Sequence, residues 1–460
     1  MVESEPATAT ENEIYGLPRT LVGDARAAIE AEDAGTLTEL VADLHPADTA
    51  ALIETLSARE RSALVALVPG LVDGDVLSEL TDSLRDDIVE RLPRADLAEA
   101  VRGLDSDDMV DLVETLDEDV QEMVLSALPA SERMVVEKAL AFPEGSAGRL
   151  MQVEVVRVPE DWTVGEASAF LRASHDLPDQ FYHVLLVDAR MRPVGYCTLG
   201  RILSSPVQTK LKDITEDSFR TFHVLAEEEE VARAFNRYHL IPAPIVDDAE
   251  RLVGVVTIDD AVRILDEELE EDMLSLAGVG GDSSVTDSVV DTVKSRIPWL
   301  AVNLGTAILA SFIIGLFEDA IAQIVALAVL MPIVASMGGA AGTQGLTVAV
   351  RALATKELTG ANAWRIIGRE LLVGLVNGAV FSVLICAVSW YRFGDLMIGV
   401  VIGMAMILNL VAAAAAGVLI PIALDKAKVD PAIASGPFVT TVTDIIGFFA
   451  FLGLAVLILL

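Results

Sequence analysis

The sequence is poor in cysteine and lacks the motifs of nucleotide hydrolysis. Its two cysteines, Cys197 and Cys386, lie far apart and the second is within an apolar run, which argues against a disulfide framework or a thiolate metal site. It contains no Gly-x-x-x-x-Gly-Lys segment and no evident Cys/His nucleophile pair, so we expect a protein that is not an enzyme. An apolar core is also absent from Met1 to Glu13. Without a signal peptide, the soluble part should stay in the cytoplasm.

Positive charge is scarce and unevenly distributed. The chain has 32 Lys or Arg against 70 Asp or Glu, and residues 301–460 contain only 7 and 8 of these. Residues 1–300 therefore hold 25 basic and 62 acidic side chains, a net charge of −37 out of −38. Such a surface repels nucleic acid and attracts cations, although adaptation to a halophilic, very salty cytoplasm would also explain dispersed acidity. The length of 460 residues predicts two or three domains.

An apolar side chain recurs every twelve residues between residues 47 and 142. The positions are Leu56, Val68, Leu80, Leu92, Leu104, Leu116, Leu128 and Leu140. Each closes a short amphipathic run, and Pro, Asp or Ser begins the next. This spacing predicts short helices stacked in pairs, an α-helical superhelical repeat domain over residues 15–141 that follows a disordered tail at 1–14. One irregular helical domain is the alternative.

Two similar units follow over residues 142–262. The first predicts a helix at 163–171 and strands at 182–188 and 193–198, and the second repeats this order at 230–235, 243–248 and 252–260. The order resembles a tandem pair of CBS domains. Such a resemblance implies an α/β module that dimerises and often senses adenosyl nucleotides or ions.

In CBS pairs a Gly-x-x-Thr-x-x-Asp segment holds a ribose. Gly254, Thr257 and Asp260 fit this segment, whereas the first unit has Arg201 at the position of the Asp. The resemblance therefore implies at most one good nucleotide pocket, with ATP as the candidate ligand at Thr257 and Asp260. A purely structural pair is the alternative.

A strongly acidic stretch comes after the second unit. Over residues 258–278, apolar side chains recur at spacings of three and four beside a group of Glu and Asp residues, which predicts an amphipathic helix with an acidic face. The helix belongs to a connecting segment, residues 263–292, that links the CBS pair to the membrane and can transmit movement between them. A plain solvated connector is the alternative.

Five apolar runs occupy the last third of the chain. They lie at about 298–317, 320–350, 371–390, 396–424 and 432–460 and predict an all-α transmembrane domain of five helices over residues 293–460. Basic residues gather before the first run and in the loops after the second and fourth, whereas the other two loops contain only Arg392. By the positive-inside rule, this multi-pass protein of the cell membrane has a cytoplasmic N-terminus and an extracellular C-terminus.

The last apolar run contains a single charge, Asp444, shortly after Thr440 and Thr441. A carboxylate at membrane depth is costly, so it normally faces a partner or a water-filled path. Hydroxyl and carbonyl oxygens are donors that a hydrated cation accepts at a pore wall. The sequence therefore predicts an ion site at Asp444, with Thr440 and Thr441 as further contacts. An Asp at the headgroup level of a helix end is the alternative.

Two other runs contain residues that a simple anchor would not need. Pro332 and the glycine-rich segment 338–345 should loosen or break the second helix and expose carbonyl groups where it lines a cavity. Close packing through small residues is the alternative explanation for the glycines. The candidate pore residues in these runs are Gly338, Gly339, Gln344 and Asn377.

The helical repeat domain, the CBS pair, the acidic connecting helix and the five spans follow one another as in the MgtE family of magnesium channels and transporters. The chain resembles this family over nearly its whole length. The resemblance is carried by the junction Phe142-Pro-Glu-Gly-Ser-Ala-Gly-Arg-Leu-Met151, Arg296-x-x-Trp299-Leu300, Phe317-Glu318, the Gly338-Gly339 segment through Gln344, Arg351-Ala-Leu-Ala354, Asn377-Gly378 and Asp430-Pro-Ala-x-x-Ser-x-Pro437 followed by Asp444. It implies a homodimer in the lipid membrane whose pore lies between the subunits, with Asp444 at the ion site. It also implies that the acidic connecting helix is linked to the gate.

The chain departs from the family pattern at three places. The family usually has Asn after the Gly-Gly pair and often Asn before the Pro, where this chain has Ala340 and Gly436. Both changes remove an amide oxygen near the implied ion path. In the second CBS unit, His239 stands where the family often has an acidic residue.

We therefore expect a Mg²⁺ channel or transporter that drives divalent cation uptake and is closed by cytoplasmic Mg²⁺. Magnesium dehydrates reluctantly, so one or two carboxylates that hold a partly hydrated ion suit it. Regulatory Mg²⁺ would bridge acidic surfaces of the repeat domain, the CBS pair and the connecting helix. The candidate sensor residues are Asp105, Asp107, Asp108, Glu229, Asp259, Asp260, Glu268, Glu271 and Asp272.

Other functions stay open at this point. Glu318, Glu370 and Asp444 could form the relay of a sodium- or proton-coupled divalent cation transporter. A membrane-anchored CBS nucleotide sensor would use the spans only as an anchor. The sequence does not distinguish Mg²⁺ from Co²⁺, Mn²⁺ or Ni²⁺, since pores built from hard oxygen donors overlap in the ions they pass.

Overall fold

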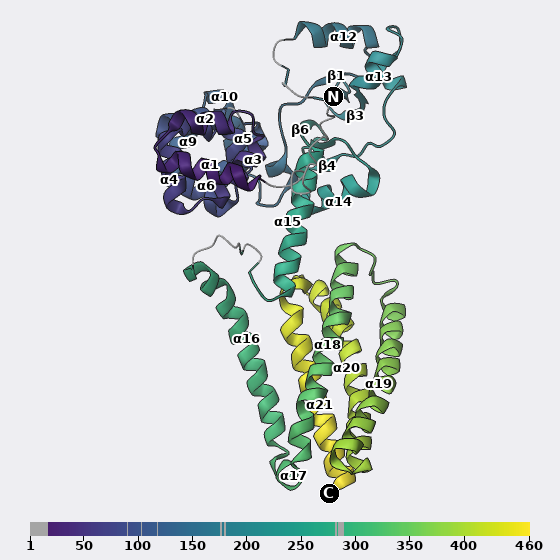
Figure 1. Ribbon diagram of the computed structural model, residues 1–460. Helices are drawn as coiled ribbons and strands as arrows, with labels where there is room; N and C mark the ends of the chain where they lie inside the picture. The colour runs from purple at the N-terminus through teal and green to yellow at the C-terminus, as the bar shows by residue number, and fades with distance from the viewer. Residues whose placement is uncertain are drawn as a thin grey trace, which may run out of the picture. The chain divides into compact units, whose positions relative to one another are not determined.

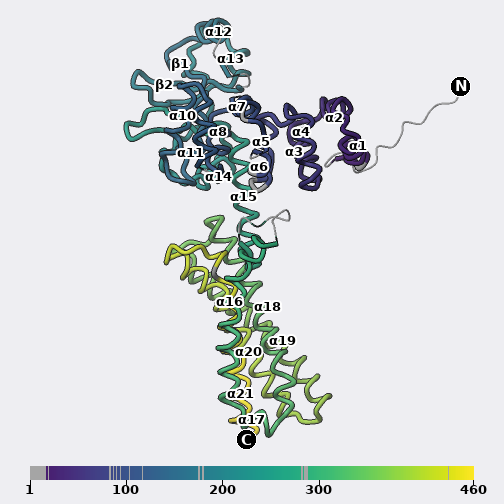
Figure 2. Tube along the Cα trace, turned by 90° about the vertical axis from the view of Figure 1, so that its left-hand side faces the viewer, coloured from purple at the N-terminus to yellow at the C-terminus, as the bar shows by residue number. Residues whose placement is uncertain are grey.

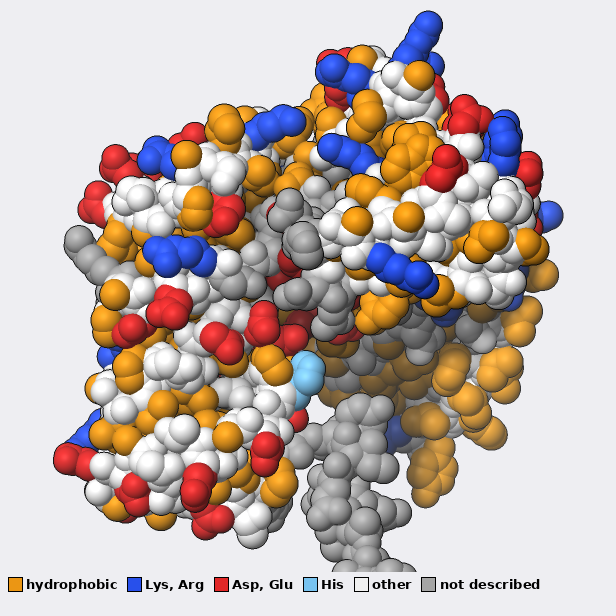
Figure 3. Space-filling view, turned by 90° about the horizontal axis from the view of Figure 1, so that it is seen from above, with side chains coloured by type: hydrophobic (Ala, Val, Ile, Leu, Met, Phe, Trp, Pro, Cys, Tyr) orange, Lys and Arg blue, Asp and Glu red, His pale blue; other side chains and the backbone are white. Residues whose placement is uncertain are grey.

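The computed structural model divides the chain into two compact units, Met1–Glu267 and Glu268–Leu460 (Figure 1). It describes residues 17–460, except 90, 103, 117, 175–176, 179–180, 281–282 and 284–288. On the face shown in Figure 3, acidic side chains are scattered among other residue types and do not gather in one patch. This distribution agrees with the dispersed acidity of the sequence.

Short helices make up the first part of the first unit (Figure 1, Figure 2). Successive alternate helices contact one another, as in α3 with α5, α5 with α7, and α7 with α9, which is the contact pattern of a superhelical stack. The predicted repeat is confirmed. The helices are α1 (Arg19–Glu30), α2 (Ala34–Val41), α3 (Pro46–Thr55), α4 (Ala58–Leu67), α5 (Gly74–Ser78), α6 (Asp82–Val89), α7 (Arg94–Arg102), α8 (Ser106–Thr115), α9 (Glu118–Ala127) and α10 (Ala130–Leu140), with a 3₁₀ turn at Pro69–Leu71.

The twelve-residue period places its apolar residues in the core of this stack. Leu56, Leu80 and Leu92 are buried, whereas Val68 and Leu140 pack against the same core from its edge. Helix starts are fixed locally: Ser57 forms a capping box with Glu60 at the start of α4. Each short helix therefore gains its stability from neighbours, since helices of this length are marginal alone.

Two three-stranded sheets follow with the same topology. In the first, β1 (Arg157–Pro159) pairs in parallel with β2 (His183–Val187), which pairs antiparallel with β3 (Pro193–Thr198). The second repeats this order with β4 (Phe222–His223), β5 (Ala243–Val246) and β6 (Leu252–Val256). Both second strands have a register shift before their last paired residue. The predicted pair of similar α/β units is confirmed.

Helices flank these sheets and lead out of the unit. They are α11 (Ala147–Leu150), α12 (Val164–Ala173), α13 (Leu199–Ser204) and α14 (Glu228–Tyr238), with a 3₁₀ turn at Leu211–Asp213. The predicted acidic helix is present as α15 (Ile258–Leu276). It starts directly after β6 and crosses the boundary between the two units.

Among its described residues, the second unit contains five helices that are long and apolar enough to cross a membrane, as predicted. In chain order the helices are α16 (Val289–Gly315), the short α17 (Glu318–Gln323), α18 (Ala326–Ala354), α19 (Ala363–Phe393), α20 (Leu396–Lys426) and α21 (Pro431–Leu459). Helix α20 packs against α18, α19 and α21. It is the central span. In its most apolar stretch of 18 residues, 56% of the residues are buried, against 6% in the corresponding stretch of α16.

The predicted break at residues 338–345 is wrong. Helix α18 runs without interruption from Ala326 to Ala354 and includes Pro332. The apolar run is instead interrupted near its start, at the two residues between α17 and α18. Unpaired backbone groups are costly in lipid, so an unbroken helix is favoured wherever its glycines can be used for packing.

Glycines of α18 do serve close packing. A Cβ atom at Gly338 would lie 2.3 Å from Nδ2 of Asn409 on α20, and one at Gly342 would lie 2.6 Å from Cγ1 of Val439 on α21. A Cβ atom at the neighbouring Gly339 would have nothing within 4 Å of it. The packing explanation thus holds for Gly338 and Gly342.

We predict that Gly338→Ala destabilises the membrane unit and that Gly339→Ala does not. Asn409 is fully buried and must shift to admit the methyl group, an overpacking penalty of roughly 1–3 kcal/mol. The midpoint of thermal unfolding in detergent should fall for Gly338→Ala only. Equal midpoints for the two variants would contradict the assignment of Gly338 to packing.

Candidate functional site

The intramembrane carboxylate lies on a face of α21 that also carries hydroxyl groups. Thr440, Thr441 and Asp444 are spaced by three and four residues, so they share one side of the helix. Thr440 Oγ1 donates to the Gly436 carbonyl at 3.1 Å and Thr441 Oγ1 to the Pro437 carbonyl at 2.6 Å. Because each hydroxyl proton is used within the helix, the oxygen lone pairs remain to face an external donor or cation.

Asp444 itself is partly buried. Within the part of the chain that the structure describes, no hydrogen bond or ion pair joins its carboxylate to another group. Charges inside membrane spans are normally paired or face a cavity. The carboxylate of Asp444 therefore requires a cation, water or a second protein chain to complete its environment.

The other candidate pore residues have different settings. Gly338 is buried beneath Asn409, so it serves packing. Gln344 on α18 and Asn377 on α19 are both exposed, and Gly339 has open space beside it. In the described part of the chain, no hydrogen bond links Gln344 or Asn377 to α21. The single chain thus brings together Asp444, Thr440 and Thr441 on one helix.

Asn409 is a structural residue that was not among the predicted pore residues. Its side chain is fully buried, and Nδ2 donates to the Val334 carbonyl of α18 at 2.8 Å. A Cβ at Gly447 of α21 would lie 2.8 Å from the same Nδ2, so the amide sits where three spans meet. Its Oδ1 is buried and has no partner among the described residues. The sequence feature that could have identified Asn409 is a single amide side chain in an otherwise apolar run.

The predicted sensor acids of the repeat domain lie at its contact with the CBS pair. Ser106, the first residue of α8, donates from Oγ to Glu154 Oε2 at 2.6 Å and accepts from the Val153 amide at 2.9 Å. Asp107 and Asp108 follow on the same helix turn. The start of α8 is therefore fixed on the strand region that opens the first CBS unit.

Two arginines lie in this contact. Arg149 of α11 is 2.7 Å from Glu114 of α8, and Arg263 of α15 lies 3.3 Å from Asp260 and 3.8 Å from Asp111. These cations offset part of the negative charge that α8 and the start of α15 bring together.

The remaining carboxylates repel one another. Burial, followed by the nearby Asp260, raises the pKa of Asp107 well above its usual range, and the same two causes raise the pKa of Asp108 to about 6. Burial, followed by Glu154, raises the pKa of Asp105. Oδ1 of Asp107 is buried without a hydrogen-bond partner in the described structure. The contact thus contains an excess of buried negative charge, for which a proton or a cation would compensate.

The other sensor candidates are spread more widely. Asp259 lies beside Asp260 at the start of α15 and is exposed, whereas Glu229 pairs with Arg233 one turn along α14. Glu268, Glu271 and Asp272 lie farther along α15, in the second unit. Among the described residues, no three His, Cys, Asp or Glu side chains form a ready metal cluster. Asp105, Asp107 and Asp108 are nevertheless near enough to Asp260, and Asp105 to Asp259, for their charges to interact.

The predicted ribose segment is engaged in internal contacts. Thr257 Oγ1 donates to Asp260 Oδ2 at 2.7 Å, and Asp260 is buried beside Arg263. A Cβ at Gly254 would lie 2.7 Å from the side chain of Met151. Gly254 and Asp260 therefore have structural roles in the unliganded chain that do not depend on a nucleotide.

Family models match three parts of the chain. The model for the MgtE intracellular N domain matches residues 44–145, that for the CBS domain matches 212–267, and that for MgtE, a divalent cation transporter, matches 331–454. The Magnesium transporter MgtE of Bacillus subtilis is 31% identical over 416 residues, which are 90% of this chain and 92% of the relative. The chain belongs to the MgtE family.

Other relatives agree with this assignment. The Magnesium transporter MgtE of Enterococcus faecalis is 34% identical over 67% of this chain and 68% of its own length, and that of Thermus thermophilus is 30% identical over 94% and 97%. A crystal structure of the cytosolic domain of the Mg²⁺ channel MgtE with ATP is 28% identical and covers 53% of this chain and 99% of its own, with a TM-score of 0.49. The family models and the curated relatives confirm the predicted family. The helices and sheets of the described residues confirm the fold class, a helical N domain, a CBS pair and five membrane helices.

The acidic contact in this MgtE chain gives a prediction for pH. A carboxyl with a raised pKa in the docked state binds a proton more tightly there than when α8 is free, so docking weakens as the pH rises from the usual 3.8 to about 6 for Asp108. The difference corresponds to roughly 3 kcal/mol at most. In metal-free buffer, protection of the Val153 amide against hydrogen exchange, corrected for the intrinsic rate, should fall about tenfold or more between pH 4 and pH 7.

The matched variants are Asp108→Asn and Asp43→Asn. The first removes one of the titrating groups and should make the pH dependence shallower, with Asp105 and Asp107 still titrating. The second neutralises an exposed carboxylate elsewhere in the N domain and should leave the profile unchanged. Equal profiles for all three proteins would show that Asp108 does not control the contact.

Proposed function

We propose that this protein carries Mg²⁺ into the cell through its membrane domain as a homodimeric channel. The observation that supports the proposal is Asp444, a carboxylate within a membrane span that has no partner among the described residues of its own chain. Family membership supplies the ion class, a divalent cation. Because the relatives are named magnesium transporters, Mg²⁺ is the ion to test first.

The chemistry of the site suits a hydrated ion. In a two-fold dimer the two Asp444 carboxylates would hold Mg²⁺ through its water shell, with the hydroxyl oxygens of Thr440 and Thr441 as further acceptors. Because Mg²⁺ keeps several waters, paired carboxylates and outer contacts are enough to bind it without a full protein cage. A divalent ion that moves inward gains about 4.6 kcal/mol per 100 mV of membrane potential, which would drive uptake.

Regulation is proposed at the acidic contact of the N domain with the CBS pair. Asp107 and Asp108 of α8 lie near Asp260 of α15, so a bound cation would relieve repulsion that a docked N domain otherwise suffers. A ligand shifts such an equilibrium only by its differential affinity for the two states. Cytoplasmic Mg²⁺ would thus favour the docked state, which we assign to the closed channel together with Glu268, Glu271 and Asp272 of the connecting helix.

ATP is proposed as a ligand of the second CBS unit. Thr257 and Asp260, the residues that match the ribose segment in sequence, lie at the junction of β6 and α15. Since Asp260 already accepts from Thr257 and pairs with Arg263, nucleotide binding would compete with these contacts. Nucleotide and N-domain docking would then be coupled through Asp260.

We predict that Asp444→Asn abolishes Mg²⁺ flux and leaves a folded protein, because the hydrated ion loses its anionic acceptors and the helix loses a charge that its fold does not use. The measurement is Mg²⁺ uptake into proteoliposomes under a membrane potential, without a sodium or proton gradient. Near-normal uptake by folded Asp444→Asn would refute the ion site.

The same assay distinguishes a channel from a sodium- or proton-coupled transporter. Uptake by the unmodified protein in the absence of sodium and proton gradients supports a channel. Uptake that appears only with one of those gradients, and that is lost in Glu318→Gln or Glu370→Gln, would favour the relay. Competition by Co²⁺, Mn²⁺ and Ni²⁺ measures selectivity in the same vesicles.

We also predict that millimolar Mg²⁺ increases protection of the Val153 amide at neutral pH in molar KCl. The bound divalent ion should replace the proton that stabilises the contact at low pH. Asp108→Asn should show high protection without Mg²⁺, since it removes one of the repelling charges. If KCl alone gives the same protection as Mg²⁺, the acids act only as a halophilic surface, because screening depends on ionic strength and not on ion identity.

A further inference from the structure

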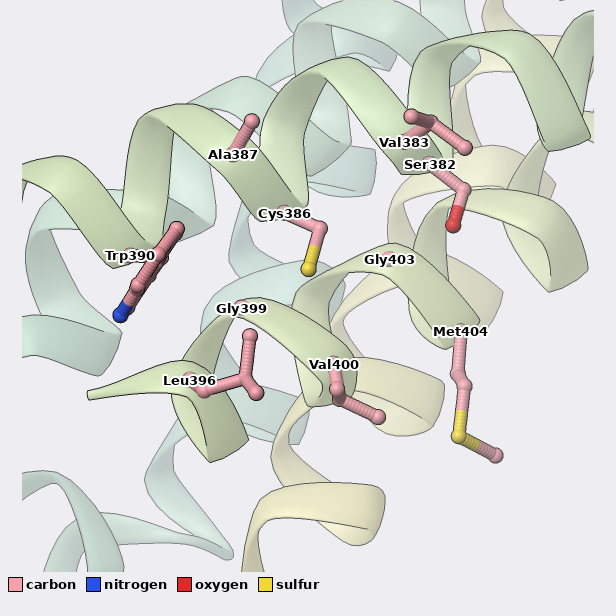
Figure 4. Close-up of a pocket in the computed structure, with 10 residues that line it drawn as sticks. All are labelled: Ser382, Val383, Cys386, Ala387, Trp390, Leu396, Gly399, Val400, Gly403 and Met404. Atoms are coloured by element: carbon pink, nitrogen blue, oxygen red, sulfur yellow. The ribbon is translucent and has the colours of Figure 1, made fainter.

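An apolar groove of about 410 Å³ runs between α19 and α20. Figure 4 shows Trp390 and Leu396 at one end, Ser382 and Met404 at the other, and the sulfur of Cys386 between the two helices. The lining extends over nine residues of each helix, 382–390 and 396–404, which corresponds to a length of roughly 12 Å. It lies entirely on membrane-spanning helices and is separate from the face of α21 that carries Asp444.

Two glycines make the floor of this groove. A Cβ at Gly399 would lie 2.8 Å from the Cys386 carbonyl oxygen, and one at Gly403 would lie 2.6 Å from Ser382 Oγ. The helix backbones therefore approach closely along this line. Larger side chains remain exposed on either side, among them Trp390 at 56% and Leu396 at 54%. The result is a linear apolar trough with a closed floor and open top.

The trough ends at the turn that joins its two helices. Gly394, with a φ of 72°, ends α19, and Asp395 caps α20 through the Met397 amide at 2.8 Å. Arg392 and Tyr391, just before this turn, are exposed, Tyr391 to 93%. Aromatic residues at this level are typical of the membrane–water interface.

Arg392 supplies positive charge at the open end. Its guanidinium lies 5.5 Å from the Phe393 ring centre, and within the described residues no carboxylate forms an ion pair with it. By the charge distribution of the loops, this turn faces the outer leaflet. Arg is suited to phosphate, because its planar donors engage two oxygens at once.

We propose that this trough binds one anionic phospholipid of the outer leaflet, with a hydrocarbon chain along Gly399 and Gly403 and the headgroup phosphate on Arg392. Three observations converge on this occupant. The trough is linear and apolar, it lies in the bilayer, and its open end carries an exposed cation beside interfacial aromatic rings.

The rate at which Cys386 is alkylated measures whether the trough is occupied. It lines the trough, whereas Cys197 is fully buried and burial raises the pKa of its thiol to about 11, so a maleimide should alkylate Cys386 selectively. The experiment measures by mass spectrometry the rate at which N-ethylmaleimide modifies the delipidated full-length protein in detergent. Phosphatidylglycerol, phosphatidylcholine or glycerol phosphate is then added.

Phosphatidylglycerol should slow alkylation of Cys386 about tenfold more than phosphatidylcholine does, the effect expected of one charge-assisted contact. Glycerol phosphate, which has no chain, should not protect. Arg392→Gln should remove the preference for phosphatidylglycerol, and Arg392→Lys should keep part of it. Arg369→Gln, at the opposite end of α19, is the matched control and should behave as the unmodified protein does.

Other outcomes overturn the proposal. Equal protection by the two lipids would show ordinary annular lipid, and protection by glycerol phosphate would show a free phosphate site. A preference that survives Arg392→Gln would remove Arg392 from the site. Protection that depends on protein concentration and not on lipid would assign the groove to a second copy of the chain.

Discussion

Most of the membrane unit depends on one constraint: polar groups inside the bilayer must find partners within the protein. Asn409 meets it in part, since its Nδ2 has a partner whereas its buried Oδ1 has none among the described residues. Its amide lies where α18, α20 and α21 meet, donates to the Val334 carbonyl and is admitted by glycines on both neighbouring helices. Thr440 and Thr441 follow the same rule by donating to their own helix. Asp444 differs from these residues because the group without a partner among the described residues is a carboxylate, which can carry a full charge.

The first unit also contains charge that its own residues do not fully compensate. Arg149 and Arg263 offset some of the acids where α8 meets the CBS pair, yet Asp107 keeps a buried oxygen without a partner and the pKa of Asp108 is raised to about 6. Replacing these acids by neutral residues would stabilise the contact, so their presence is a disadvantage for folding alone. Such a disadvantage is understandable if the strength of the contact has to depend on the cation concentration.

Both candidate sites contain carboxylates whose charge is not fully compensated by the described residues. They differ in what surrounds them: Asp444 is in a span whose other side chains are uncharged, whereas the acids of α8 lie beside arginines that limit their repulsion. An ion at the first site would meet hydroxyl and carbonyl oxygens, and an ion at the second would compete with protons and guanidinium groups. The first arrangement suits passage of a hydrated ion and the second suits graded sensing.

The sequence by itself determined the architecture, because that depends on periodicities that survive without tertiary information. The twelve-residue spacing of leucines predicted the stacked helices, the repeated strand pattern predicted the two sheets, and apolar length predicted the five spans. It also singled out Asp444, since a charge in an apolar run is visible in one dimension. Only the tertiary structure decided what the glycines do: Gly338 packs under Asn409 and Gly339 faces open space, although the two are identical neighbours. It alone brought Asp107 to Asp260 across about 150 residues and set the trough at Gly399 and Gly403, because such contacts depend on which helix faces meet.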